Sequence, residues 1–297
     1  MEKSNIDEKI KLLTGNGMWH TQETEDLPSV HLSDGPHGLR KQEEKERQNN
    51  VSLVSTCYPT ASALACSWDV TAAERLGRAV AKEAWNADVA VLLGPGINMK
   101  RSPLCGRNFE YFSEDPFLAG RLGAAYVSAA QGEDVAVSLK HFAANNQETN
   151  RQTSNSQIDE RALREIYLSA FEYVVKTARP ATIMASYNRL NGYYACENRH
   201  LLTEILREEW GFDGVVISDW GACADLAKAV KAGMDLEMPD SHGIHARKLK
   251  AALKAGEISE ADIAQAAGRI EKLVKKYAPD NLSLIHISEP TRRTPIS

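Results

Sequence analysis

Short apolar runs that end in polar residues alternate with helical segments from near the start of the chain to about residue 277. Strand signals that alternate with helical ones are typical of parallel βα units, in which a helix follows each strand and packs on the sheet. No stretch of different composition interrupts the alternation, so we expect one large α/β domain. The candidate strands with polar ends are 30–35, 63–68, 89–98, 135–141, 182–188, 214–219 and 234–239.

The helical segments have the spacing of helices that bury one face. Within 159–178, apolar side chains from Leu163 to Val174 recur at i, i+3, i+4 and i+7, which places them on one side of a helix. We expect such faces to pack on the sheet. The predicted helices include Asp69 to Asn86, 116–131, 159–178, 198–210 and a last one that carries Ile263 and Val274.

The many polar strand ends favour a (β/α)8 TIM-type barrel with one irregular strand. A barrel collects side chains from the ends of many strands at one face, whereas the ligand crevice of a doubly wound sheet uses far fewer. The sequence Gly94-Pro95-Gly96 does not complete the GxGxxG pattern of a dinucleotide site. We expect the barrel to span residues 1–278.

Charge and composition exclude several classes of function. A formal net charge of -5, without a basic run among aromatic residues, argues against nucleic-acid binding. The first residues carry charges where a signal peptide needs apolar ones, and no window approaches the ~18 apolar residues of a membrane span. The five cysteines are widely spaced and lack a CxxC pair. We expect a cytoplasmic protein without membrane partner, disulfides, metal or cofactor.

The segment GFDGVVISDWG, residues 211–221, carries a candidate functional carboxylate. Its apolar run from Val215 to Ile217 predicts a buried strand, so Asp219 lies where that strand leaves the core. Barrel enzymes place their catalytic groups at this end of a strand. The segment taken alone is equally consistent with a helix cap formed by Ser218 or Asp219.

Other strand ends suit a sugar, which needs paired hydrogen bonds to its hydroxyls and a flat apolar surface. Asp34 follows a short strand, although its Gly-Pro neighbours also fit a simple turn. Lys140 and His141 end another strand, where Lys140 could instead form a structural ion pair. Four charged residues individually resemble solvated loop charges, namely Arg107, Glu110, Glu148 and Arg151.

Five motifs in the order SDGPHGLR, GRNFEYFSEDP, KHFAANNQETNR, MASYNRLNG and VISDWG resemble the N-terminal barrel of glycoside hydrolase family 3, particularly its β-glucosidases. The resemblance spans about residues 6–277. It implies a retaining, exo-acting β-glucosidase that removes terminal non-reducing β-D-glucosyl residues, with Asp219 as the nucleophile. The implied substrate-binding residues are Asp34, Arg107, Lys140, His141, Arg151, Tyr187 and Trp220.

These roles agree with the chemistry. An ionised carboxylate beneath the anomeric carbon stabilises an oxocarbenium-like transition state and then bonds to that carbon. We expect Lys140, Arg107 and Arg151 to favour the ionised form of Asp219. Asp34 would bind the hydroxyls at carbons 4 and 6, while Lys140 and His141 would bind neighbouring hydroxyls.

The resemblance leaves the partner acid outside the chain. One branch of the family carries an Asp-His dyad on the loop after KHFPGHG, and this chain has KHFAANNQETNR without such a dyad. In the β-glucosidase branch the acid is a Glu on a second, α/β-sandwich domain, which we expect to be missing here. Glu148 is the substitute that the sequence offers. The fragment is therefore predicted to be catalytically impaired.

Several alternatives remain open from the sequence. Other members of the same family cleave β-xylosides or β-N-acetylglucosaminides, and a fragment without its acid could act as a sugar-binding module. A different class of enzyme, a Schiff-base aldolase, would use Lys140 as its nucleophile.

The last residues, LSLIHISEPTRRTPIS from 282 to 297, break the pattern of the rest of the chain. They contain no Ala, Gly or Lys and have no helical or strand periodicity. The stretch LSLIHISEPTR resembles the conceptual translation of a sequencing adapter. We therefore expect 279–297 to comprise the start of a linker and a non-native tail.

Overall fold

The computed structural model of the chain describes residues 6–42 and 51–278. At its centre lies a parallel five-stranded sheet whose strands are ordered as they occur in the chain. Helical segments connect each of these strands to the next, as the alternation predicted. The strands are β3 (Leu32–Asp34), β4 (Val91–Leu93), β5 (Ala136–Phe142), β7 (Thr182–Ala185) and β10 (Val215–Ser218).

Beyond β10 the sheet continues through isolated bridges, which close it toward β3. A hairpin of β1 (Gly15–Asn16) and β2 (His20–Thr21) forms part of this closure. The bridges are Ile217 to Leu236, Thr14 to Glu237 and His20 to His31. The predicted TIM-type barrel is confirmed, and this closure is its irregular side. Within the predicted strand 234–239, only Leu236 and Glu237 pair with neighbouring segments, each through an isolated bridge.

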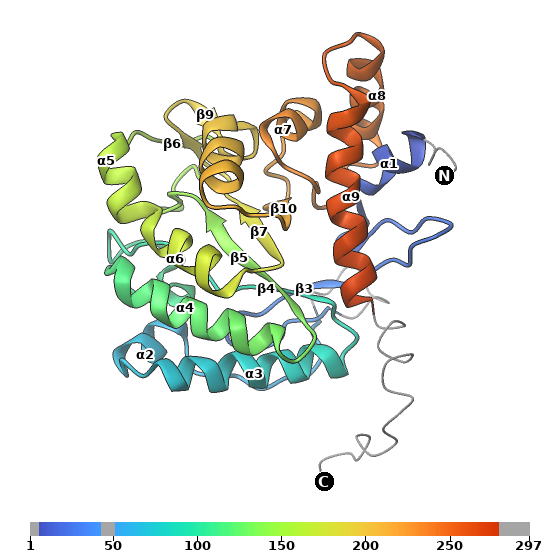
Figure 1. Ribbon diagram of the computed structural model, residues 1–297. Coiled ribbons are helices and arrows are strands. Elements are labelled where there is room, and N and C mark those ends of the chain that lie inside the picture. The colour runs from blue at the N-terminus through green and yellow to red at the C-terminus, as the bar shows by residue number, and fades with distance from the viewer. Residues whose placement is uncertain (1–5, 43–50, 279–297) are drawn as a thin grey trace.

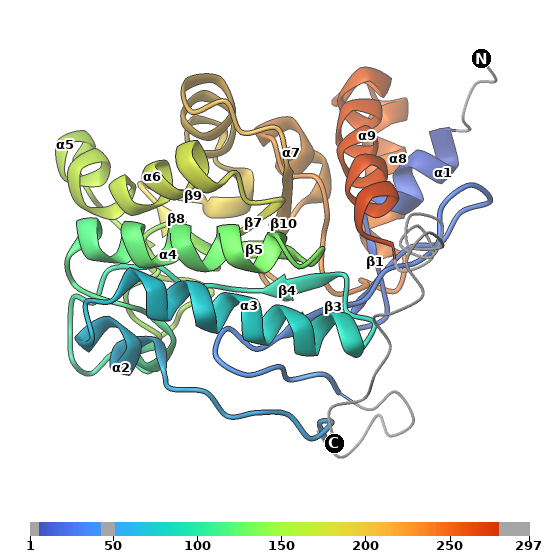
Figure 2. The same ribbon diagram turned by 60° about the horizontal axis from the view of Figure 1, so that its bottom comes forward.

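Helices cover the outside of the sheet (Figure 1). Helices α3 and α4 lie side by side over β4 and β5, and α6 packs against α4 (Figure 2). At the other end of the molecule, α1 packs against α8 and α9. The α-helices are α1 (Ile6–Leu12), α2 (Ala61–Cys66), α3 (Val70–Asn86), α4 (Pro116–Gln131), α5 (Glu160–Ala162), α6 (Ser169–Ala178), α7 (Leu226–Ala232), α8 (Ile244–Lys254) and α9 (Glu260–Tyr277).

Shorter elements complete the description. A small sheet beside the barrel contains β6 (Asn155–Ser156), β8 (Arg189–Leu190) and β9 (Tyr193–Tyr194). Two 3-10 segments are η1 (Asn108–Glu110) and η3 (Ala195–Glu197), and two π-helical segments are η2 (Leu163–Tyr167) and η4 (His200–Glu209). Among the described helices, none combines the length and apolar character needed to cross a membrane. The predicted tail, 279–297, lies outside the described residues.

The sequence predicted most helices correctly and one strand wrongly. The helices predicted at 69–86 and 116–131 are confirmed as α3 and α4, whereas those at 159–178 and 198–210 contain the π-helical segments η2 and η4. The predicted strand 63–68 is wrong, because these residues lie in or directly after helix α2. Its alanine-rich run has no β-branched residue, and Thr60 caps the helix by accepting a hydrogen bond from the Ala63 N–H at 3.3 Å.

A buried ion network around Asp235 joins three elements of the barrel. Its carboxylate contacts Arg207 of η4 at 2.7 Å and Arg269 of α9 at 2.9 Å. The same carboxylate accepts a hydrogen bond from the Val216 N–H of β10 at 2.8 Å. Asp235 thereby ties two covering helical segments to a central strand.

The substitution Asp235→Asn should strongly destabilise the fold. Removing one partner of a buried ion pair typically costs about 3–5 kcal/mol, because the remaining charge stays buried without compensation. Urea unfolding monitored by circular dichroism would measure the loss. The exposed Asp26, in the turn between Thr24 and Leu27, offers a matched Asp26→Asn control that should change the free energy of unfolding by less than about 0.5 kcal/mol. Equal stability of the two variants would contradict the role of Asp235.

Candidate active site

The carboxyl ends of the central strands bring the predicted site residues to one edge of the sheet. Asp34 ends β3, Lys140 and His141 lie near the end of β5, Tyr187 follows β7, and Asp219 follows β10. Parallel strands place all of these residues at the same edge. All five are buried except Asp34, which is half-buried.

Asp219 is fixed by backbone hydrogen bonds on both sides. Its N–H donates to the carbonyl oxygen of Ala185 in β7, and its own carbonyl oxygen accepts from the Ala222 N–H, each at 2.9 Å. One carboxylate oxygen, Oδ1, accepts a hydrogen bond from the Trp220 N–H at 2.8 Å. The backbone around Asp219 therefore determines where its second oxygen, Oδ2, lies.

The helix-cap alternative for this strand end is excluded. Helix α7 is capped by Asp225, whose carboxylate accepts hydrogen bonds from two N–H groups of its first turn. Ser218 is engaged elsewhere, because its hydroxyl accepts from the Met238 N–H at 2.9 Å and donates to the Met238 carbonyl oxygen at 3.1 Å. Asp219 therefore does not cap helix α7, and its carboxylate lies at the end of strand β10.

Arg107 and Lys140 form a buried charge network with three carboxylates. The Arg107 guanidinium contacts Glu110 through Nε, and its Nη1 lies 3.6 Å from Asp219 Oδ2. Lys140 Nζ lies 3.5 Å from Glu110 Oε2 and 3.7 Å from Asp34 Oδ1. Burial opposes ionisation of Glu110, but Lys140 and Arg107 outweigh it, so the pKa of Glu110 is lowered. The sequence left open whether Lys140 forms a structural ion pair. It forms two, with Glu110 and Asp34, and both lie within the candidate site.

His141 is a neutral imidazole with a defined tautomer. Burial, followed by the positive charge of Arg107, holds its pKa well below the usual value. Arg107 Nη2 lies 2.6 Å from His141 Nε2 and can only donate, so Nε2 accepts and Nδ1 carries the proton. Nδ1–H then donates to the Tyr111 hydroxyl oxygen at 3.0 Å. The approach of Nε2 to Asp219 Oδ2, at 3.7 Å, is therefore not an ion pair.

Two buried polar atoms of this network have no hydrogen-bond partner among the described residues. They are Asp219 Oδ2 and Arg107 Nη1, which lie 3.6 Å apart. A buried polar atom without a partner carries a desolvation penalty of about 1–3 kcal/mol. A ligand that supplies hydroxyl groups would satisfy such atoms, so this is where a polyol is expected to bind.

The pKa of Asp219 is raised above the usual value of an aspartate. Burial is the largest cause, and it outweighs the opposing effects of Arg107, Lys140, the Trp220 N–H and the Tyr187 hydroxyl. The sequence predicted that the cations favour the ionised form, and Arg107 and Lys140 act in that direction. Their effect offsets burial only in part.

Tyr187 lies beside Asp219, and Arg151 lies against Tyr187. The Tyr187 hydroxyl donates to the Trp220 carbonyl oxygen at 2.9 Å. The Arg151 guanidinium stacks on the Tyr187 ring at 4.4 Å and pairs with Glu148 at 2.9 Å. Among the described ion pairs, none joins Arg151 to Asp219. Arg151 instead contacts the Tyr187 ring directly, and its positive charge also contributes to the lowered pKa of His141.

Trp220 provides an apolar surface next to Asp219. Its indole Nε1–H donates to the Met18 carbonyl oxygen at 2.7 Å, which fixes the ring. The ring of Trp19 lies 5.2 Å away at an interplanar angle of 38°, and Trp19 Nε1–H donates to Gln42 at 3.0 Å. Two adjacent indoles offer the flat apolar face that a sugar ring needs.

Some site residues escaped the sequence interpretation. Glu110 was weighed as a loop charge, and Tyr111 was not considered, although both lie in the same motif as Arg107. Asn98 holds His141 from behind, since its amide donates to the His141 carbonyl oxygen and accepts from the His141 N–H. Asn98 and Trp19 lack any local sequence signal for these contacts.

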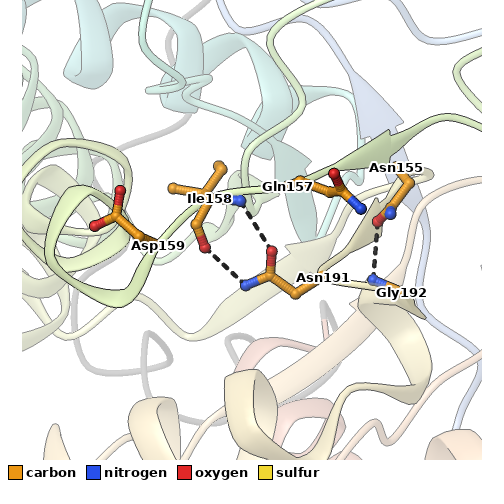
Figure 3. Close-up of a pocket in the computed structure, with 6 residues that line it drawn as sticks. All are labelled: Asn155, Gln157, Ile158, Asp159, Asn191 and Gly192. Carbon is orange, nitrogen blue, oxygen red and sulfur yellow. Dashed lines mark hydrogen bonds between the residues drawn. The ribbon is translucent and has the colours of Figure 1, made fainter.

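A surface pocket away from these residues lacks comparable chemistry. It is lined by Asn155, Gln157, Ile158, Asp159, Asn191 and Gly192 (Figure 3). The Asn191 side chain exchanges two hydrogen bonds with the backbone of Ile158, and Asn155 accepts one from the Gly192 N–H. These two side-chain amides are hydrogen-bonded to backbone groups, so the pocket offers fewer unpaired polar groups than the strand ends do.

The substitution Arg107→Gln should raise the pKa of Asp219 further. It removes the largest of the effects that oppose burial, so Asp219 should keep its proton to a higher pH than in the unsubstituted chain. Carbon-13 NMR of the aspartate carboxyl groups, assigned with Asp219→Asn, would follow the titration. Arg40→Gln is the control, because Arg40 pairs with Asp34 at 3.7 Å and is half-exposed. An unchanged or lowered pKa in Arg107→Gln would refute this account.

Comparison with known proteins agrees with the geometry of this site. The profile described as "Glycosyl hydrolase family 3 N terminal domain" matches residues 36–273. The chain is 51% identical over 278 residues to "Thermostable beta-glucosidase B" of Acetivibrio thermocellus, covering 92% of this chain and 37% of that protein. It is 47% identical to "Exo-alpha-(1->6)-L-arabinopyranosidase" of Bifidobacterium longum, covering 91% of this chain and 36% of that protein.

Solved structures point to the same family. The crystal structure of a β-glucosidase from Kluyveromyces marxianus in complex with glucose superimposes with a TM-score of 0.89 at 41% identity, over 95% of this chain and 34% of that one. The chain spans less than two fifths of the length of these three relatives. Because the family profile covers most of the described residues, the chain belongs to glycosyl hydrolase family 3, in its N-terminal domain.

Proposed function

We propose that this chain forms the glucosyl-binding and nucleophile half of a retaining, exo-acting β-glucosidase, with Asp219 as the nucleophile. The observation that carries the proposal is Asp219 Oδ2, a buried carboxylate oxygen without a hydrogen-bond partner among the described residues. It lies beside Arg107 and His141 at the edge where Asp34 and Lys140 meet. Relatives named as β-glucosidases support the choice of substrate.

The two oxygens of Asp219 suit different tasks. Oδ1 is held by the Trp220 N–H, which fixes the carboxylate, while Oδ2 is free to attack an anomeric carbon. Attack by Oδ2 forms a covalent glycosyl-enzyme ester as the bond to the leaving oxygen breaks, and water later hydrolyses the ester. Asp219 must be ionised to attack, so its raised pKa predicts loss of reactivity on the acid side.

The surrounding side chains can bind the sugar hydroxyls. Arg107 Nη1 and Lys140 Nζ are donors, Asp34 is an acceptor, and the neutral His141 can exchange its Arg107 contact for a hydroxyl. A hydrogen bond to a charged group contributes about 1.5–3 kcal/mol. Several such bonds, together with the Trp220 indole, would hold one sugar unit above Asp219 Oδ2.

The partner acid is proposed to come from a segment beyond the described residues. A retaining glycosidase needs an acid about 5–5.5 Å from its nucleophile. Glu110, Asp34 and Glu148, the candidate carboxylates of this region, each form an ion pair with a lysine or arginine. A carboxylate engaged in this way is a poor proton donor. The relatives are longer than this chain, which leaves room for a second domain that carries the acid.

Asp219 should be labelled by an activated 2-deoxy-2-fluoro-glucoside that carries a dinitrophenyl leaving group. Such a leaving group departs without a proton, so the reaction needs the nucleophile and not the acid. Mass spectrometry should find one fluoroglucosyl adduct on the chain, located at Asp219. Asp219→Asn should abolish the adduct, and Asp213→Asn, at the opposite end of the same strand, should keep it. An adduct that persists in Asp219→Asn would overturn the assignment.

Hydrolysis should depend steeply on the leaving group. General acid help typically contributes about 10²- to 10⁴-fold, and a fragment without its acid loses that factor for leaving groups that need a proton. We expect this chain to cleave dinitrophenyl glucoside. We expect it to cleave cellobiose at least about 10²-fold more slowly than a longer relative that has both domains does. Efficient cellobiose turnover by this chain would show that the acid lies within it.

A second candidate is an α-L-arabinopyranosidase. Two relatives from Bifidobacterium carry the name exo-α-(1→6)-L-arabinopyranosidase, at 47% and 46% identity. Both candidates use the same nucleophile, so they are separated by which fluorosugar labels Asp219, the gluco- or the L-arabino-configured one. A Schiff-base aldolase is disfavoured, because Lys140 is engaged with Glu110 and Asp34. Glucose binding without any labelling would favour a sugar-binding module.

A further inference from the structure

A group of three metal-ligating side chains lies outside the sugar-binding residues. Cys223 belongs to the loop that follows Asp219, Glu237 belongs to the bridged segment beyond α7, and His245 lies in the first turn of α8. One donor atom from each of them lies within 4.8 Å of the other two. Cys223 and Glu237 are buried, and His245 is mostly buried. Among residues 6–42 and 51–278, no other group of this kind is present.

The donor set and its separations suit zinc. Zinc accepts one sulfur, one nitrogen and one oxygen ligand at about 2.0–2.3 Å, which separates tetrahedral ligands by roughly 3.3–3.8 Å. The widest of the present separations need to close by about 1–1.5 Å, and the Glu237–His245 contact needs to open by about an ångström. Three protein ligands leave a fourth position for water. We propose that Cys223, Glu237 and His245 form a zinc-binding site in this barrel.

The surroundings hold the ligands in place. The Glu237 backbone is fixed on both sides, because its N–H donates to the Leu13 carbonyl oxygen and its carbonyl oxygen accepts from the Gly15 N–H, each at 2.9 Å. The Ser241 hydroxyl lies 3.4 Å from Glu237 Oε2, and it accepts a hydrogen bond from the His245 N–H at 3.2 Å. Such outer contacts orient metal ligands. His245 keeps 16% of its side chain exposed, which offers the ion a route of entry.

Binding would convert the Cys223 thiol into a thiolate and release its proton to solvent. The thiolate and the Glu237 carboxylate neutralise the two charges of the ion, and His245 contributes a neutral nitrogen. No redox step is involved. A borderline-soft ion such as Zn²⁺ fits a mixed set of sulfur, nitrogen and oxygen ligands better than Mg²⁺ or Ca²⁺, which prefer oxygen ligands.

The site shares its backbone with the proposed nucleophile. The Ala222 N–H, next to Cys223, donates to the Asp219 carbonyl oxygen, and the Gly221 N–H donates to the Met238 carbonyl oxygen at 2.8 Å. An ion that draws Cys223 toward Glu237 therefore acts on both ends of the loop that positions Asp219. Occupancy should move the Asp219 carboxylate.

Cobalt and zinc titrations of the full chain test the site. Co²⁺ bound to a thiolate gives a charge-transfer absorption, so we expect one equivalent of Co²⁺ to produce this band and Zn²⁺ to abolish it. Cys223→Ser should lose the band. His245→Gln should bind Zn²⁺ at least about tenfold more weakly, since even an outer-shell change costs about 10- to 100-fold.

Matched controls are the exposed Cys66→Ser and the exposed His242→Gln, which should bind both ions like the unsubstituted chain. Absence of the band at one equivalent of micromolar Co²⁺ would overturn the site. Unchanged binding in both Cys223→Ser and His245→Gln would do so too. These readouts need no glycosidase activity, so they stand apart from the proposed function.

The coupling to Asp219 has its own readout. Saturation with Zn²⁺ should shift the carbon-13 carboxyl resonance of Asp219 in the unsubstituted chain and leave it unshifted in Cys223→Ser. An unshifted resonance in a chain that binds zinc would overturn the coupling.

Discussion

The charge balance among buried groups at the strand ends governs the rest of the site. Two buried cations, Arg107 and Lys140, face the carboxylates of Glu110, Asp219 and Asp34. A neutral His141 adds no charge to this set. Burying these ions costs free energy that their neighbours offset, so removing any one carboxylate weakens the compensation of the cation that it contacts. The excess of carboxylates suits a ligand that develops positive charge.

Burial raises the pKa of both central carboxylates, but their net pKa shifts are opposite because the nearby cations act more strongly on Glu110. Glu110 contacts both cations and its pKa is lowered, whereas Asp219 faces Arg107 with one oxygen only and its pKa is raised. Glu110 is thereby committed to holding Arg107 and Lys140. Among the described residues, Oδ2 of Asp219 has no hydrogen-bond partner, as the proposed nucleophile requires. Contacts alone thus distinguish the structural carboxylate of Glu110 from the proposed nucleophile.

The sequence predicted those parts of the fold that depend on local patterns. Buried runs such as 135–141 and 214–219 predicted both the strands and their polar ends, because apolar β-branched residues favour strands and parallel ends gather at one edge. The run 63–68 was wrongly predicted as a strand, since apolar length alone does not distinguish a strand from an alanine-rich helix. The closure through Thr14 and Glu237 joins residues far apart in the chain, so no local pattern could reveal it.

Residues that act through contacts between distant segments were the hardest to predict. The role of Arg151 in sugar binding stays a prediction, while its stacking on Tyr187 was not predicted, because that contact depends on how two loops meet. The widely spaced cysteines predict no zinc site, because short motifs such as CxxC signal preformed sites. The proposed ligands Cys223, Glu237 and His245 come instead from a loop, a bridged segment and a helix start. Spacing in the sequence therefore carries little information about a site whose geometry the barrel closure creates.

The arrangement is consistent with the proposal that this barrel binds a sugar without completing its hydrolysis. The described strand ends place the proposed nucleophile and hydroxyl-binding charges on one side of the ligand, and a retaining reaction needs its acid on the side of the leaving group. Asp34, Glu110 and Glu148 are all committed to ion pairs that hold the nucleophile side together. Freeing one of them to act as an acid would remove one ion pair from Arg107, Lys140 or Arg151. In the proposed mechanism the proton donor therefore comes from a separate segment, which can approach the leaving group without disturbing the charges around Asp219.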